Sequence, residues 1–169
     1  MRAILLASLL LASGVAESAD AQSCHSPAGE WTLAPSESHI GTSLSFNPYY
    51  EIAAVHLSIR TDGSTISQSW AFKGPHLDRI THYKIASDGI RHPTTLQDAM
   101  DFEYIAISAE WQNCTLLVTG ISQLFGMEIA TTNTYVISVD GRQLTILQYG
   151  ESPISVVDRQ LVFRRSGSR

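Results

Sequence analysis

The chain has 169 residues, of which 44% are hydrophobic and 16% charged, and its formal net charge is -5. This composition predicts one globular domain and excludes disordered and fibrous classes. The acidic balance argues against a nucleic-acid partner, and two cysteines are too few for a disulfide scaffold or a four-cysteine zinc site.

Residues 1–21 have the pattern of a secretory signal peptide. Arg2 precedes the apolar run Ala3–Ala12, and Ala19-Asp20-Ala21 has the small-x-small form of a cleavage site after Ala21. The apolar run is too short to span a bilayer, which takes about 20 residues. We therefore expect a periplasmic or secreted protein with no membrane insertion after cleavage. A retained anchor and a lipoprotein modified at Cys24 are the alternatives.

Both cysteines, Cys24 and Cys114, remain after this cleavage. Exported proteins mature in oxidising compartments, where paired cysteines form disulfides. A Cys24–Cys114 bridge would tie the new N-terminus to the body of the domain, and in the chain-entropy model a loop this long contributes about 4–5 kcal/mol. Two separate thiols are the alternative.

The mature chain shows turn signals rather than helical periodicity. Asp-Gly dipeptides end at Gly63, Gly89 and Gly141, and each lies between two runs typical of β-strands. The interval from Gly89 to Gly141 is twice that from Gly63 to Gly89, and Gln112-Asn113-Cys114 supplies a turn near its middle. Four such turns predict four hairpins.

Apolar and polar side chains alternate along the segments between these turns, as in strands with one buried and one solvated face. The alternating segments are 55–60, 66–72, 81–85, 105–111 and 127–138. Less regular strands are expected at 114–121 and 143–149, a first strand at 30–34 and a last at 160–164. Residues 35–51 are expected to form a loop, 94–100 at most one helical turn, and 166–169 a disordered tail.

These segments predict an all-β domain over residues 22–165, built as an up-and-down antiparallel meander of eight to ten strands. Closing the meander into a barrel removes the two exposed edges of the sheet. A two-sheet β-sandwich is the alternative, because periodicity does not separate the two.

The first strand opens with Gly29-Glu30-Trp31, which resembles the Gly-x-Trp signature of lipocalins and the wider calycin group. The chain also resembles small exported bacterial lipocalin-like proteins. Here the similarity lies in Ser36 or Ser38 after the first strand, the hairpin at 137–141 and the segment 157–160. The resemblance covers nearly the whole mature chain and implies a lipocalin-like barrel.

The resemblance also implies how one end of the barrel is closed. In such barrels the tryptophan of the signature closes one end, and a basic side chain from near the last strand packs across its indole. Gly29 and Trp31 would take the first role here, and Arg164 or Arg165 the second. An arginine over a tryptophan face is a cation–π pair worth about 0.5–2 kcal/mol.

No motif for catalysis or metal binding is evident, and no cofactor is predicted. The six histidines have neither His-x-His nor helical i, i+4 spacing. Gly120-Ile121-Ser122-Gln123-Leu124 fails the nucleophile-elbow pattern at its last position. Asp98, Asp101 and Glu103 form a carboxylate cluster that we interpret as solvated loop charge.

A set of large side chains on the apolar strand faces would line the interior of a barrel. It consists of Trp70, Phe72, Tyr83, Ile107, Trp111 and Tyr135. The polar Gln68, Thr81 and Thr131 fall on the same faces, and an apolar wall with a few polar groups is typical of a ligand pocket.

Our first hypothesis is therefore a monomeric, non-enzymatic barrel that binds a small apolar or amphipathic molecule. A filled barrel that acts through its surface in the cell envelope is one alternative. The other is an isomerase or cyclase that uses Tyr83, Tyr135 or a histidine as its acid–base group.

Overall fold

A computed structural model describes residues 24–39, 54–74, 78–95, 104–124, 127–152 and 155–167. The predicted signal peptide, most of the predicted loop at 35–51, most of the predicted helical turn at 94–100, the carboxylate cluster at 98–103 and the last two residues lie outside these ranges. Within the described residues, no helix has both the length and the apolar character needed to cross a membrane.

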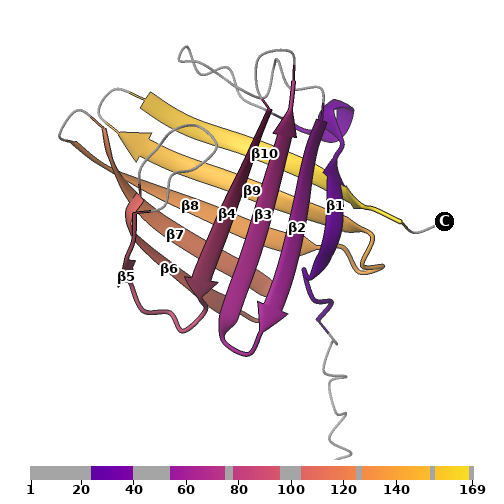
Figure 1. The fold of residues 1–169 in the computed structure, drawn as a ribbon, viewed down its shortest axis with the longest axis horizontal. Coiled ribbons are helices and arrows are strands. Elements are labelled where there is room, and N and C mark those ends of the chain that lie inside the picture. The colour runs from indigo at the N-terminus through magenta and orange to yellow at the C-terminus, as the bar shows by residue number, and fades with distance from the viewer. Residues whose placement is uncertain are drawn as a thin grey trace, which may run out of the picture.

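The described residues form ten strands and one 3-10 helical turn (Figure 1). The elements are β1 (Gly29–Leu33), η1 (Pro35–Glu37), β2 (Ala54–Asp62), β3 (Thr65–Lys73), β4 (Asp78–Ala86), β5 (His92–Pro93), β6 (Tyr104–Gln112), β7 (Thr115–Leu124), β8 (Met127–Ile137), β9 (Gln143–Ser152) and β10 (Ser155–Arg165). The predicted all-β class is confirmed.

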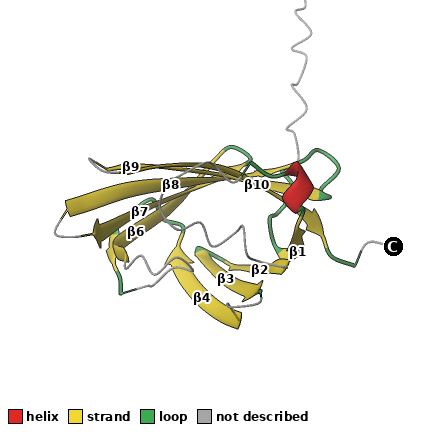
Figure 2. Cartoon of the chain, turned by 90° about the horizontal axis from the view of Figure 1, so that it is seen from above, coloured by secondary structure: helices red, strands yellow, loops and turns green. Residues whose placement is uncertain are grey.

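All ten strands belong to one antiparallel sheet in the order β4-β3-β2-β1-β10-β9-β8-β7-β6-β5. β1 pairs with β2 on one side and with β10 on the other, so the first and last strands join the two ends of the meander. β2–β4 lie across from β6–β9, and the two groups of strands run at a steep angle to each other (Figures 1 and 2). The result is a nearly closed barrel, as predicted, and one continuous sheet excludes the two-sheet alternative.

The predicted turns are present, but one of them does not make a hairpin. Gly63, Gly141 and Asn113 have positive φ angles of 55°, 68° and 55° and join paired strands. Gly89 also has a positive φ, 74°, but it follows β4 and leads to β5, and these two strands are not paired. The Asp-Gly turn at Gly89 therefore lies where the barrel remains open, between β4 and β5.

The inner face of the sheet carries the hydrophobic core, as the alternation predicts. Val55, Leu57 and Ile59 on β2 are almost completely buried, and so are Leu144 and Ile146 on β9. β6 departs from the expected pattern, because the pairing with β7 shifts register between Tyr104 and Ala106. That irregularity buries Tyr104 and leaves Ile105 exposed, whereas the sequence predicted Ile105 on the inner face.

Candidate functional site

Five of the six side chains predicted to line the interior lie together in the barrel. Trp70, Phe72, Ile107 and Tyr135 are buried members of one core cluster, and Tyr83 is partly buried against that cluster. Trp111 lies on the same face of β6 as the buried Ile107, and it pairs with the fully buried Leu116 of β7. It stands near the end of its strand with 41% of its surface exposed, so the structure does not bring it together with the others.

The aromatic rings on β3 pack against one another and against the last strand. The Trp70 and Phe72 rings are stacked with centroids 6.0 Å apart, and Trp70 meets Phe163 of β10 edge-on at 5.8 Å. These are favourable aromatic geometries, and they fix the indole of Trp70 within the inner wall.

A buried amide, Gln68 on β3, forms the centre of a polar cluster in this wall. Only 4% of Gln68 is exposed. Its side-chain carbonyl Oε1 accepts one hydrogen bond from the indole Nε1 of Trp70 at 3.0 Å and another from the hydroxyl of Tyr135 at 3.1 Å. The indole N–H of Trp70 determines which way the amide points, because it can only donate and the opposite orientation would place an N–H group of Gln68 against it.

The other half of that amide has no partner among the described residues. Nε2 of Gln68 is buried and makes no hydrogen bond to the described residues. Oγ1 of Thr81 on β4 is likewise buried without a hydrogen bond to them. Gln68 and Thr81 are diagonal neighbours on the inner face, because Gln68 pairs with Tyr83 and Trp70 pairs with Thr81. Burying a polar group without a partner costs about 1–3 kcal/mol, so such groups in a folded interior call for an explanation.

The polar cluster continues across the opposite strands. Asn133 lies two residues from Tyr135 on β8, and its Oδ1 accepts a hydrogen bond from Nε2 of Gln148 on β9 at 2.8 Å. Oε1 of Gln148 is buried without a partner among the described residues. Arg159 of β10 is paired in register with Gln148 and only 4% exposed. A stripe of amide, hydroxyl and guanidinium groups therefore crosses an otherwise apolar wall.

The sequence prediction missed Arg159 as an interior residue, although a signal was present. Leu161 and Phe163 are buried on β10 at the same parity, so simple alternation places Arg159 inside. Burying a charged side chain destabilises the folded protein unless hydrogen bonds or an opposite charge compensate for the lost solvation. Arginine is the basic residue best suited to such positions, because its planar group makes several directed hydrogen bonds.

Burial raises the pKa of Tyr135 to about 12, although the hydrogen bond to Gln68 acts in the opposite direction. The phenol therefore keeps its proton over the whole physiological range. Tyr135 is a hydrogen-bond donor in this interior and is not available as a base near neutral pH.

The end of the barrel near β1 is covered by Trp31 and Arg165. Trp31 is 1% exposed, its indole Nε1 donates to the carbonyl of Pro27 at 2.9 Å, and Cζ of Arg165 lies 4.3 Å from its ring centroid. Gly29 stands against the same guanidinium: an added Cβ would lie 2.5 Å from Nη1 of Arg165, at a φ of +146° that favours glycine.

Arg164, the other candidate for this position, points elsewhere. It is exposed and forms an ion pair with Glu37 of η1. The two arginines follow each other on β10, so strand alternation sends their side chains to opposite faces. Of the two, Arg165 is the one that lies over the indole.

The predicted disulfide between Cys24 and Cys114 is present, with the two Cα atoms 5.0 Å apart. It joins the segment before β1 to the residue that precedes β7. The N-terminal segment is thus held both by this bridge and by Arg165, whose Nη1 donates to the carbonyl of Ala28 at 3.0 Å. In the part of the chain that the structure describes, no three His, Cys, Asp or Glu side chains are grouped to hold a metal ion.

Comparison with solved structures places this fold among small barrels. The fatty acid transporter REP1-NXSQ superposes with a TM-score of 0.59 at 11% identity, over 84% of this chain and 97% of that one. Apo lipid binding protein 8 of Caenorhabditis elegans superposes with a TM-score of 0.60 at 13% identity, over 82% and 94%. A mutant of the fluorescent protein UnaG gives 0.56 at 18% identity, over 82% and 95%.

No protein-family model matches this sequence, and no curated protein matches it. The similarity is therefore structural, at sequence identities that show the fold alone. It agrees with the Gly29-Glu30-Trp31 opening and with the nearly closed ten-stranded meander. The chain has the fold of a calycin-type, lipocalin-like barrel.

Proposed function

We propose that the interior of this barrel binds one small, largely apolar molecule that carries a polar group. The observation that supports this most directly is the amide of Gln68. Two hydrogen bonds hold its orientation, while its N–H donors are buried without a partner among the described residues. A ligand with a carbonyl or carboxylate oxygen at this point would accept from them.

The chemistry of the surrounding wall fits an amphipathic ligand. Binding sites for small molecules are mainly apolar and aromatic, with a few polar groups that fix the orientation of the ligand. Trp70 and Ile107 supply apolar surface, Gln68 and Thr81 supply donors, and the oxygen of Gln148 supplies an acceptor. The polar end of the ligand would lie along this stripe and its hydrocarbon part against the apolar wall.

Two further observations favour binding over catalysis. Tyr135 is held protonated by its burial, which removes it as a general base. Solved barrels of similar fold include a fatty acid transporter and a lipid binding protein, which supports the same class of role by analogy.

The proposal includes export of the protein. The signal-peptide pattern of residues 1–21 predicts it, and a disulfide between the only two cysteines suits an oxidising compartment. N-terminal sequencing of the protein from its own cells would begin at Gln22. An intact Met1, or a lipid-modified Cys24, would contradict this part of the proposal.

The binding proposal is tested by titrating dodecanoate, its methyl ester and dodecane while following tryptophan fluorescence and, in parallel, isothermal calorimetry. Dodecanoate or its ester should bind with a dissociation constant well below a millimolar, because their oxygens meet the Gln68 and Thr81 donors. Dodecane should bind at least about tenfold more weakly, since it leaves those donors unsatisfied.

Two variants locate the site. Thr81→Val removes a hydroxyl that makes no described hydrogen bond, so it should weaken dodecanoate binding without loss of stability. Gln68→Leu should weaken it further, and Gln123→Leu on the exposed face of β7 is the matched control. If none of the three compounds binds below a millimolar, or if both interior variants bind like the control, the interior is not the site.

A further inference from the structure

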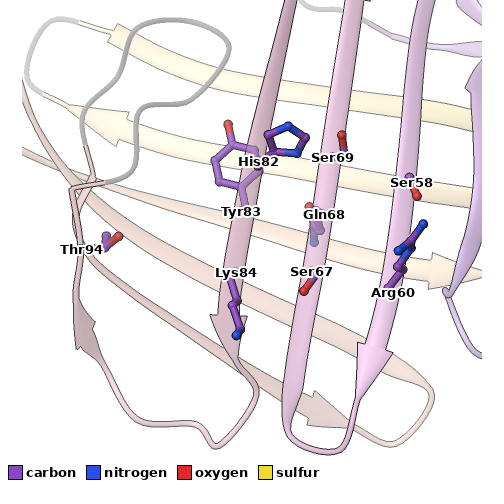
Figure 3. Close-up of a pocket in the computed structure, with 9 residues that line it drawn as sticks. All are labelled: Ser58, Arg60, Ser67, Gln68, Ser69, His82, Tyr83, Lys84 and Thr94. Carbon is purple, nitrogen blue, oxygen red and sulfur yellow. The ribbon is translucent and has the colours of Figure 1, made fainter.

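A groove of about 610 Å³ lies along β2–β4 (Figure 3). Its lining consists of Ser58, Arg60, Ser67, Gln68, Ser69, His82, Tyr83, Lys84 and Thr94. Most of the strand residues in this lining point outward, because their neighbours Leu57, Ile59 and Ile66 are buried in the core. Gln68 and Tyr83 are the exceptions, since both face the interior. The basic side chains of the groove therefore lie on the outer face, although the groove shares two strand positions with the interior.

The lining of this groove is basic and rich in hydroxyl groups, with no acidic residue in it. Arg60, His82 and Lys84 are exposed, whereas Ser67 and Ser69 between them are partly buried. Two acids flank the groove. Glu30 of β1 accepts a hydrogen bond from the hydroxyl of Ser58 at 2.6 Å, and Asp62 lies two residues after Arg60 on the same face of β2. Neither is part of the lining, in which all the charged side chains are basic.

Strand register sets the spacing of these groups. Arg60, Ser67 and Lys84 are directly opposite one another on β2, β3 and β4, and Ser58, Ser69 and His82 form the next row. Neighbouring strands are about 4.8 Å apart, so the backbones of Arg60 and Lys84 are separated by about 10 Å. Both side chains are long enough to converge on one small group above Ser67.

We propose that this groove binds a tetrahedral oxyanion, a phosphate or sulfate group. Arginine offers two parallel N–H donors to such a group, lysine offers a compact positive charge, and serine hydroxyls donate to the remaining oxygens. Three basic residues, Arg60, His82 and Lys84, share this lining on a protein whose overall charge is -5. The same chemistry is found in a soluble phosphate or sulfate ester and in the headgroup of an anionic lipid.

The test uses the mature protein, with the disulfide intact, in a low-salt buffer free of phosphate and sulfate. Inorganic phosphate and sulfate are titrated while backbone amide shifts are followed by NMR. Separately, the protein is sedimented with vesicles of phosphatidylglycerol or of phosphatidylcholine. Arg60→Gln and Lys84→Gln are compared with Lys73→Gln at the far end of β3 and Arg142→Gln in the β8–β9 turn, which are exposed basic residues outside the groove.

We expect saturable shifts centred on Ser67 and Ser69, and affinity at least about tenfold lower in each groove variant than in either control. If the free anions bind this way, the ligand is a soluble oxyanion. If only phosphatidylglycerol vesicles bind, and the groove variants weaken that binding, the source is a lipid headgroup. Small shifts spread over all basic residues, or equal losses in the groove and control variants, would overturn the proposal. Dodecanoate binding in the interior should be unchanged in every variant, so the two proposals fail independently.

Discussion

Replacing Arg165 by methionine tests whether one side chain holds together the end of the barrel near β1. The guanidinium lies over Trp31, and it also donates from Nε to the carbonyl of Gly141 at 2.8 Å and from Nη1 to the carbonyl of Ala28 at 3.0 Å. It therefore connects β10 to the segment before β1 and to the turn between β8 and β9. Methionine preserves much of the packing of the side-chain stem but removes the charge and the donors.

The expected loss follows from these contacts. Hydrogen bonds from a charged donor contribute about 1.5–3 kcal/mol each, and the lower figure applies because Arg165 is only partly buried. The cation–π contact with Trp31 adds about 1 kcal/mol. We expect Arg165→Met to lower the free energy of unfolding by about 4 kcal/mol, measured by urea denaturation with far-UV circular dichroism as the signal.

Arg164→Met is the matched control, because it removes an exposed arginine whose ion pair with Glu37 is screened by solvent. Its urea midpoint should stay close to that of the parent. A double-mutant cycle between Trp31→Phe and Arg165→Met should give a coupling of about 0.5 kcal/mol or more. Equal losses in the two arginine variants, or strict additivity with Trp31→Phe, would show that the guanidinium does not act through the indole.

Three further predictions concern the bridge and the polar interior. The Cys24→Ser, Cys114→Ser double variant should lose about 2–5 kcal/mol of stability by urea denaturation, and an unchanged midpoint would mean that the N-terminal segment is held without the bridge. The raised pKa of Tyr135 disfavours its ionisation in the folded state, so its contribution to stability is complete below pH 10 and is lost as the pH rises toward 12. The urea midpoint should therefore fall more steeply over this range in the parent than in Tyr135→Phe, and parallel curves would refute the assignment. Thr81→Val should raise the melting temperature of the ligand-free protein, because it removes a buried hydroxyl without a described partner, and a lower melting temperature would mean that this hydroxyl is satisfied in solution.

Much of the fold was predictable because strand alternation and turn residues act over short distances. The alternation of Val55, Leu57 and Ile59 predicts a buried face, and Asp-Gly at 62–63 predicts the following hairpin. The open side of the barrel was not predictable in this way. Gly89 adopts the same left-handed backbone as Gly63, and only the pairing of the next strand decides whether a turn closes a hairpin.

The interior site was predicted in part, for a related reason. Period-two alternation places Trp70, Tyr135 and Gln68 inside, but it does not show which polar atoms meet. The bond between Tyr135 and Gln68 joins residues 67 positions apart, across the barrel. Such contacts depend on how the sheet curls. On β6, the irregular pairing after Tyr104 moved Ile105 to the outer face, and a bulge leaves no clear signal in one sequence.

The pairing of the first strand with the last also constrains when the molecule can fold. β1 has β2 as one neighbour, but its other edge is completed only by β10, which ends at Arg165. A ribosome must therefore have made the chain through β10 before the ring of strands can be joined, and contacts so distant in sequence form slowly. For the export proposed above, a precursor that stays open until β10 emerges would remain able to pass through a narrow translocation channel. Removal of the C-terminal strand, which in many proteins is a mild truncation, would here leave β1 with a bare edge and an unfinished core.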